Sequence, residues 1–146
     1  MPYTNRRILF VDDHQDTHAM LATLLGRSGH DVVGVDNPLS ALVFARHQAF
    51  DLFILDKLFT SGTGIDLCRR IREFDPFTPI VFFSGDGREA ARYESINAGA
   101  QAYVTKPDID GLLSIVNSLL DPPKSTQLQN GQEKDGETNS TRFGAD

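Results

Sequence analysis

Short apolar runs alternate with longer stretches of helical periodicity along this chain. Each run holds three or four mostly apolar positions, as in strands that are buried on both faces of a sheet. Between the first two runs, Met20, Leu21, Leu24 and Leu25 recur at helical spacing. We predict strands at residues 8–11, 32–35, 52–55, 80–83 and 102–104. We predict helices at residues 16–28, 38–48, 88–97 and 109–120, with another between the glycine-bearing loop 61–64 and Pro76.

Local signals support these boundaries and the fold class that they imply. Asn37 followed by Pro38 is typical of a helix N-cap with proline at the first helical position, and Gly29 is typical of a helix end. Five strands that alternate with five helices imply an α/β fold, in which helices cover both faces of a doubly wound parallel sheet. Ligands of such sheets bind beyond the carboxyl ends of the strands, near the point where the strand order reverses.

Polar groups stand where four of the apolar runs end. Asp12 and Asp13 follow the first run, Asp56 follows the third, Ser84 follows the fourth and Lys106 follows the fifth. These side chains are poor choices for a core but would meet at one edge of a parallel sheet. Three carboxylates, a hydroxyl and an amine suit a site that holds a divalent cation and a phosphoryl group.

Composition and charge narrow the class of protein. Hydrophobic residues make up 40% of the chain and charged residues 23%, which is ordinary for a globular domain. No apolar stretch is long enough for a membrane span or a signal peptide, so we expect a cytoplasmic protein without membrane insertion. The net charge of −6, without a basic stripe, argues against direct contact with nucleic acid. The single cysteine, Cys68, excludes an internal disulfide and is predicted to be a small core residue.

The composition changes abruptly at Pro122. Residues 122–146 are almost free of aliphatic side chains and rich in glycine, asparagine, glutamine, serine and threonine. Such a segment buries too little apolar surface to offset the entropy of ordering it. We therefore predict one domain over residues 1–121 and a disordered C-terminal tail over residues 122–146.

Four short motifs follow the predicted strands in order. They are VDDH at the first strand, ILD ending at Asp56, FFSG at the fourth strand and AGAQAYVTKP at the fifth. Gly64 stands eight residues beyond Asp56. With these motifs, residues 6–121 resemble a response-regulator receiver domain of two-component signalling. The resemblance implies a flavodoxin-like (βα)5 fold with strand order 2-1-3-4-5, and a cis bond before Pro107.

The resemblance also implies a role for each polar group. Asp56 would be the phosphoacceptor, which takes a phosphoryl group from a phosphohistidine and becomes an acyl phosphate. Asp12, Asp13 and Asp56 would bind Mg²⁺ (or Mn²⁺), because a hard dication relieves the repulsion among carboxylates and prefers oxygen ligands. The family adds the backbone carbonyl of Leu58 as a metal ligand. Lys106 would pair with Asp56 and then with a phosphoryl oxygen.

Further positions are implied to transmit the signal or to set the lifetime of the phosphoryl group. The hydroxyl of Ser84 would turn toward the phosphoryl group, and Tyr103 would then swing from an exposed to a buried position. Leu58 and Asp86 occupy the variable places that shape access of water to the acyl phosphate. Thr60 stands where many family members have proline, which predicts a looser loop after Asp56.

The expected partners are proteins. A histidine kinase or a histidine phosphotransfer protein would donate the phosphoryl group. A downstream protein would bind the face made by the fourth helix, the fifth strand and the fifth helix. Nothing after residue 121 resembles an output module, so we expect a stand-alone receiver; a fragment of a hybrid kinase or of a longer regulator is the close alternative. We expect no enzymatic activity beyond Mg²⁺-dependent self-phosphorylation and autodephosphorylation.

Two functions of other classes compete with this interpretation. An aspartate-nucleophile phosphohydrolase also uses Mg²⁺ and an acyl phosphate, but it needs an acid two residues beyond Asp56, where Leu58 stands. A phosphorylation-independent scaffold would not need the full set of acids together with Lys106.

Three basic side chains near the predicted site are interpreted as solvent-facing, not as site residues. His14 and His18 are four residues apart and either form a metal pair or lie on a solvated helix face. We favour the solvated face, because two ligands are too few for a site of their own. Lys57 is predicted to face solvent.

Overall fold

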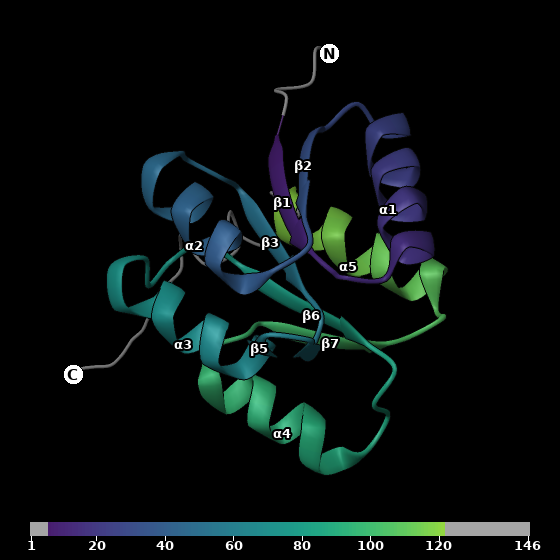
Figure 1. Cartoon of the computed structure of the whole chain (residues 1–146). Helices are drawn as coiled ribbons and strands as arrows, with labels where there is room; N and C mark the ends of the chain where they lie inside the picture. Colours follow the sequence, from purple (N-terminus) through teal and green to yellow (C-terminus); the bar gives the residue numbers. More distant parts are fainter. Residues whose placement is uncertain (1–5, 122–146) are drawn as a thin grey trace, which may run out of the picture.

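The computed structural model of the protein describes residues 6–121, and its centre is a five-stranded parallel sheet (Figure 1). Its strands are β1 (Arg7–Val11), β2 (Asp31–Val35), β3 (Leu52–Leu55), β6 (Ile80–Ser84) and β7 (Ala102–Thr105). Every neighbouring pair is parallel, and the strands lie in the order β2-β1-β3-β6-β7. This confirms the predicted doubly wound fold, because the second, first, third, fourth and fifth strands of the sheet follow one another across it.

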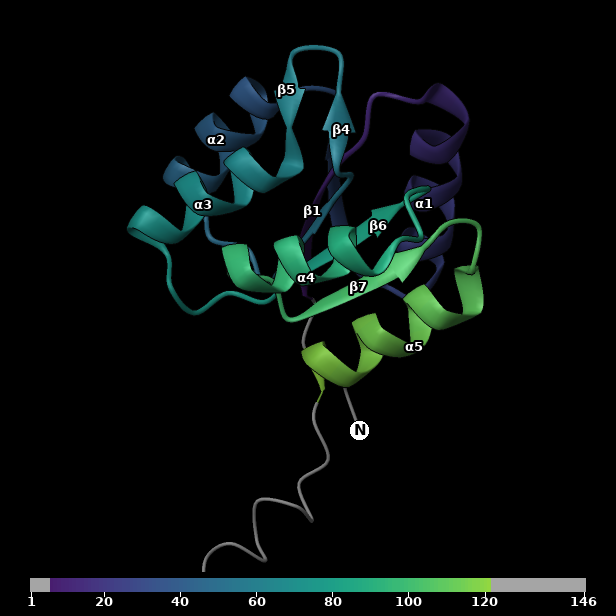
Figure 2. The ribbon, with the colours of Figure 1, turned by 90° about the horizontal axis from the view of Figure 1, so that it is seen from below.

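Five helices cover the two faces of the sheet (Figures 1 and 2). They are α1 (Gln15–Arg27), α2 (Pro38–His47), α3 (Gly64–Phe74), α4 (Glu89–Ala98) and α5 (Ile109–Leu120). One core cluster joins the sheet to α1 and α5, through side chains such as Leu21 and Leu112. The other joins it to α2, α3 and α4, through side chains such as Ala41, Ile71 and Ala91. The sheet is therefore buried from both sides.

The apolar runs of the sequence fill these two cores because side chains alternate between the faces of a strand. In β1, Ile8 and Phe10 lie in the core with α1 and α5, whereas Leu9 and Val11 lie in the core with the other three helices. All four are at most 1% exposed. Each fully buried side chain of this size contributes about 1.5–3 kcal/mol of transfer free energy. A polar group within such a run is costly, so polar groups are confined to the strand ends.

Side-chain caps begin α2 and α3. The side-chain oxygen of Asn37 accepts a hydrogen bond from the Ser40 amide (2.8 Å), with Pro38 at the first helical position. Thr63 caps α3 in the same way by accepting a bond from the Asp66 amide (3.1 Å). Such caps satisfy amides that the first helical turn leaves free. The predicted helix boundaries agree with the structure to within about two residues, which is the usual uncertainty of helix ends.

A short antiparallel hairpin between β3 and α3 was not predicted. Its strands are β4 (Leu58–Phe59) and β5 (Gly62–Thr63), which pair Leu58 with Thr63 and Phe59 with Gly62. Two-residue strands are too short to produce a periodic signal in the sequence. The hairpin stands out beyond the sheet, next to the start of α3 (Figure 2).

Cys68 lies on α3 and is fully buried, as predicted. Burial raises the pKa of its thiol to about 11, although Arg72 and Arg69 act in the opposite direction.

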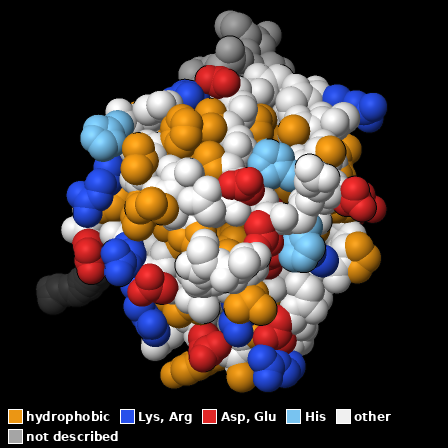
Figure 3. Space-filling view, viewed as in Figure 1, with side chains coloured by type: hydrophobic (Ala, Val, Ile, Leu, Met, Phe, Trp, Pro, Cys, Tyr) orange, Lys and Arg blue, Asp and Glu red, His pale blue; other side chains and the backbone are white. Residues whose placement is uncertain are grey.

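The predicted tail over 122–146 lies outside the described residues. Within residues 6–121, no helix is long and apolar enough to cross a membrane. On the face shown in Figure 3, Lys and Arg side chains are interspersed with Asp and Glu.

Candidate functional site

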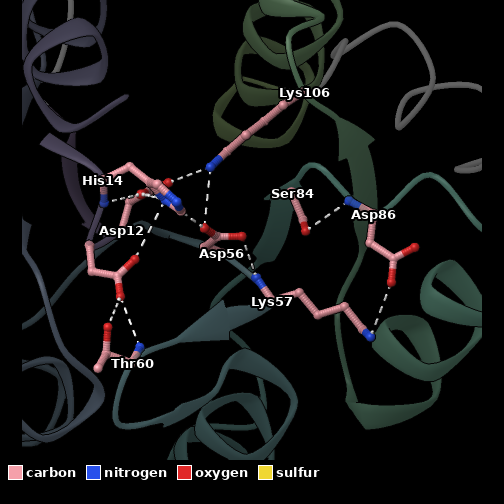
Figure 4. Close-up of polar contacts among 9 residues, drawn as sticks. Asp12, His14, Asp56, Lys57, Thr60, Ser84, Asp86 and Lys106 are labelled. Carbon is pink, nitrogen blue, oxygen red and sulfur yellow. Dashed lines mark hydrogen bonds and ion pairs between the residues drawn. The ribbon is translucent and has the colours of Figure 1, made fainter. Parts of the chain in front are cut away.

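The acids and the lysine predicted to form a site meet at the carboxyl edge of the sheet (Figure 4). Val11 is paired with Leu55 across β1 and β3, and the amide of Asp56 continues the ladder by donating to the Val11 carbonyl (3.1 Å). The Lys106 ammonium donates to Asp12 Oδ2 at 2.8 Å and to Asp56 Oδ2 at 3.2 Å. Residues that are up to 94 positions apart in the chain are thus joined by one charged group.

Burial makes this cluster electrostatically demanding. Asp12 is 2% exposed and Asp56 is 5% exposed. Burial lowers the pKa of Lys106, but the hydrogen bond that it donates to Asp12 and the charge of Asp56 outweigh that effect and raise the pKa above its usual value. One ammonium group therefore faces two buried carboxylates, with a third nearby on Asp13. The excess negative charge favours a bound cation.

Asp13 is held by the unpredicted hairpin. Its Oδ2 accepts hydrogen bonds from the Thr60 amide (2.9 Å) and from the Thr60 hydroxyl (3.1 Å). Both donors lower the pKa of Asp13, and the Thr60 amide has the larger effect. The loop after Asp56 is therefore tied to Asp13 through Thr60, and its greater looseness stays a prediction. A proline at position 60 has no amide hydrogen, so Thr60 makes a contact that proline cannot make.

The backbone around Asp56 explains the spacing to Gly64. The Lys57 amide donates to Asp56 Oδ1 (2.7 Å), and the Gly64 amide donates to the Lys57 carbonyl (2.7 Å). A Cβ on Gly64 would lie 1.9 Å from the carbonyl oxygen of Asp56. Only glycine lets α3 begin this close to the segment that carries Asp56. The peptide bond between Lys106 and Pro107 is cis, as the resemblance implied.

The prediction that Lys57 faces solvent is wrong. Its side chain is only 19% exposed, and its ammonium lies 3.5 Å from Asp86 Oδ2 and 3.4 Å from Glu94 Oε1. Glu94 is on α4, and the sequence gives no local sign that α4 approaches Lys57. The guanidinium of Arg88 holds the same Asp86 carboxylate at 2.6–2.8 Å. The hydrogen bonds from Arg88, which have the largest effect, and the one from Lys57 hold the pKa of Asp86 far below its usual range.

Ser84 and Tyr103 both contact the segment around Asp86. The Ser84 hydroxyl accepts a hydrogen bond from the Asp86 amide (3.3 Å), and the Tyr103 hydroxyl donates to the Asp86 carbonyl (2.5 Å). Tyr103 is buried, with its ring stacked on Phe82 at 6.1 Å between centroids. The structure thus records the buried position of Tyr103 and joins both predicted switch residues to one loop.

An open cleft of about 1150 Å³ gives access to these groups. Asp56, Ser84 and Lys106 line it together with Arg88 and Leu58. The Leu58 side chain is 69% exposed, so an apolar group stands at the rim. The role of the Leu58 backbone carbonyl as a metal ligand stays a prediction.

His14 lies beside the three acids, although the sequence analysis favoured a solvated helix face for it over a metal pair with His18. Its Nδ1 lies 3.1 Å from Asp12 Oδ1, 3.5 Å from Asp13 Oδ1 and 3.6 Å from Asp56 Oδ2. His18, by contrast, packs its ring edge-on against Phe10, with 4.6 Å between centroids. The adjacency of His14 to Asp12 and Asp13 in VDDH was the available signal.

The donors present fit a divalent cation. One ligand atom from each of Asp12, Asp13, His14 and Asp56 can be chosen so that all lie within 4.8 Å of one another. Carboxylate oxygens are the ligands that Mg²⁺ prefers, usually together with water. Asp12, Asp13 and Asp56 would hold this ion, which is the metal that the resemblance implies.

Fold and site together define a class, namely a doubly wound α/β domain with a lysine-paired acidic centre at the carboxyl edge of its sheet. The response regulator receiver domain family matches residues 8–117. Over 103 residues, the chain is 32% identical to the alkaline phosphatase synthesis transcriptional regulatory protein PhoP of Bacillus subtilis, which covers 70% of this chain and 43% of PhoP. The response regulator protein PilR of Pseudomonas aeruginosa is 30% identical over 118 residues, which are 80% of this chain and 26% of PilR.

Solved structures agree with these matches. The chemotaxis response regulator CheY4 of Vibrio cholerae superposes with a TM-score of 0.75 at 26% identity, over 80% of this chain and 100% of that one. The response regulator TrrA of Thermotoga maritima, solved with Mg²⁺ and BeF, gives a TM-score of 0.73 at 27% identity, over 79% and 99%. The chain belongs to the response regulator receiver domain family. It spans less than half the length of PhoP and of PilR.

Proposed function

We propose that Asp56 accepts a phosphoryl group from a phosphohistidine of a histidine kinase or a histidine phosphotransfer protein. The observation that carries the proposal is the setting of its carboxylate. Asp56 lies on the floor of an open cleft, beside the Lys106 ammonium at 3.2 Å and within the group of acids that includes Asp12. A buried carboxylate that is accessible from a cleft and flanked by a cation site is suited to attack phosphorus.

The chain's own residues account for most of the transfer. A carboxylate oxygen of Asp56 bonds to phosphorus as the bond from phosphorus to the histidine nitrogen breaks, and the imidazole leaves. Lys106 is placed to exchange its contact with Asp56 for one with a phosphoryl oxygen. Asp12 and Asp13 would hold Mg²⁺, which when bound neutralises charge on the phosphoryl oxygens. The Lys57 amide, at 2.7 Å from Oδ1, fixes the orientation of the Asp56 carboxylate.

The surroundings of Asp56 favour a phosphoacceptor over a phosphohydrolase. A hydrolase of this kind needs a second acid two residues beyond the nucleophile, and that position carries the exposed Leu58. Asp86 is close to the cleft, but Arg88 and Lys57 hold its carboxylate. We propose that this pairing keeps Asp86 from activating water and lengthens the lifetime of the phosphoryl group. The activity would then be limited to self-phosphorylation and slow autodephosphorylation.

Incubation with Mg²⁺ and acetyl phosphate is expected to add one phosphoryl group, which hydroxylamine then removes. Hydroxylamine cleaves acyl phosphates and leaves serine phosphate esters intact, so the result distinguishes Asp56 from Ser84. Intact mass spectrometry measures the addition, and EDTA in a matched sample should prevent it. If no phosphoryl group is added with Mg²⁺ present, or if it resists hydroxylamine, the proposal fails. Repeated turnover of phosphate esters would support a hydrolase instead.

We propose further that Ser84 and Tyr103 carry the signal to the face made by α4, β7 and α5. Both residues contact the backbone of Asp86, so a turn of the Ser84 hydroxyl toward a phosphoryl oxygen would move this loop and shift Tyr103 further toward its buried position. Tyr93 and Ile96 are exposed on α4 and offer apolar area to a downstream protein.

Location in the cytoplasm and lack of direct contact with nucleic acid stay predictions from the sequence.

Beryllofluoride with Mg²⁺, a stable mimic of the acyl phosphate, is expected to increase the population of buried Tyr103. NMR measures this as stronger ring-to-ring contacts between Tyr103 and Phe82, the pair that stacks in the structure. The Ser84→Ala variant should bind the mimic without changing these contacts, because it lacks the hydroxyl that turns. Equal changes in wild type and variant would show that the signal does not pass through Ser84.

A further inference from the structure

The His14 carbonyl accepts the first hydrogen bond of α1 from the His18 amide (2.9 Å), but the His14 side chain has no role in the helix. His14 occupies the N-cap position, yet its side chain makes no capping hydrogen bond. Its ring is 66% exposed, so burial does not explain where it points. The backbone is fixed by a different contact, since the His14 amide donates to Asp12 Oδ1 at 2.8 Å. The ring is thereby placed over the acids, as Figure 4 shows.

The ring nitrogen faces all three carboxylates at once. Its distances to Asp12, Asp13 and Asp56 are 3.1, 3.5 and 3.6 Å. Two ligands at right angles, each about 2.0–2.2 Å from a metal ion, lie about 3 Å apart. His14 Nδ1 therefore stands near the spacing expected of a neighbouring ligand in one coordination sphere. Thr60 restrains one of the partners, because it donates twice to Asp13.

We propose that His14 Nδ1 is a direct metal ligand and that the site prefers divalent transition ions such as Mn²⁺, Ni²⁺ or Zn²⁺ to Mg²⁺. Oxygen ligands alone suit Mg²⁺, whereas a neutral imidazole suits the transition ions and binds Mg²⁺ poorly. A single nitrogen donor added to three carboxylates thus changes the selectivity of the site without changing its charge. The inference rests on the proposed function, because it uses the same three acids as ligands.

The coordination expected of Mn²⁺ is measured directly by pulsed EPR. We expect electron spin-echo modulation from a bound ¹⁴N nucleus in the wild-type protein loaded with Mn²⁺, and its loss in the His14→Gln variant. The matched control is His18→Gln, which removes the imidazole four residues away and should keep the modulation. Loss of the modulation in the His18 variant but not in the His14 variant would overturn the assignment. Absence of ¹⁴N modulation in loaded wild type would overturn it as well.

Calorimetry then measures the selectivity. His14→Gln is expected to weaken Ni²⁺ binding by about tenfold or more while Mg²⁺ binding changes much less, because only Ni²⁺ gains from the imidazole. An unchanged preference for Ni²⁺ over Mg²⁺ would refute the proposal. On the wild-type protein alone, the ¹⁵N NMR shift of the His14 ring on addition of Zn²⁺ shows whether its nitrogen binds the metal. This measurement does not rely on a variant.

The two proposals fail in different ways. If Mg²⁺ binds and supports phosphorylation of Asp56, but no imidazole nitrogen contacts the metal, only the inference about His14 is wrong. If no divalent ion binds at Asp12, Asp13 and Asp56, both the inference and the metal-dependent function are wrong.

Discussion

Replacing Asp56 by asparagine is expected to abolish phosphoryl incorporation while leaving the domain folded. The amide of asparagine has no carboxylate oxygen to form an acyl phosphate, so the loss should be complete. The free energy of unfolding should rise by about 1 kcal/mol, because Asp56 is buried among Asp12, Asp13 and a single ammonium, and its removal reduces like-charge repulsion. Intact mass after acetyl phosphate treatment and urea unfolding measure the two effects.

Asp66→Asn is the matched control for this variant. Asp66 is an exposed acid on α3 that pairs with Arg70 at the surface, so its substitution removes the same charge outside the acidic cluster. Phosphoryl incorporation should remain at the wild-type level, and stability should change by less than about 0.5 kcal/mol. Incorporation that persists in Asp56→Asn would show that another residue is the acceptor.

Replacing Gly64 by alanine is expected to damage fold and site together. The added methyl group would stand 1.9 Å from the carbonyl oxygen of Asp56 and 2.9 Å from the ring of Phe82, and the first of these is backbone that cannot rotate away. We expect a loss of stability of about 3 kcal/mol. Because the segment that carries Asp56 must move, phosphoryl incorporation should slow by about a hundredfold. Thermal unfolding and the time course of labelling measure these losses.

Gly26→Ala makes the same chemical change as Gly64→Ala, but it is expected to stabilise the protein. Gly26 lies in α1, and nothing stands within 4 Å of the place where its Cβ would be. Alanine there should stabilise the protein by up to about 1 kcal/mol, because it reduces the freedom of the unfolded chain. Labelling should not change. If Gly64→Ala were as well tolerated as Gly26→Ala, the close approach of α3 to Asp56 would be wrong.

The sheet and most of the site are predictable from the sequence because each depends on local pattern. An apolar run such as 52–55 can be buried on both faces only as an interior strand, and the polar residue that ends it must lie at the sheet edge. Parallel strands bring these ends together, so Asp12, Asp56 and Lys106 could be placed near one another before any contact was known. The sequence showed Gly64 at a fixed spacing of eight residues from Asp56. The structure explains the glycine, because a side chain there would collide with the backbone of Asp56.

The contacts that the sequence did not reveal all join segments whose mutual approach has no local signal. Thr60 reaches Asp13 only because two-residue strands fold into a hairpin beyond the sheet. Lys57 is partly buried because Glu94 arrives on a helix more than thirty residues later. The direction of His14 is set by backbone angles at the start of α1. Propensity and periodicity do not determine such tertiary contacts.

The burial of Cys68 has a practical consequence. It is the only thiol in the chain, it has no exposed surface, and its pKa of about 11 keeps it protonated near neutral pH. Alkylating reagents can therefore reach a reactive thiolate only after α3 has separated from the sheet. The rate of alkylation becomes a direct reading of how often that helix opens, in each variant and with each bound ion.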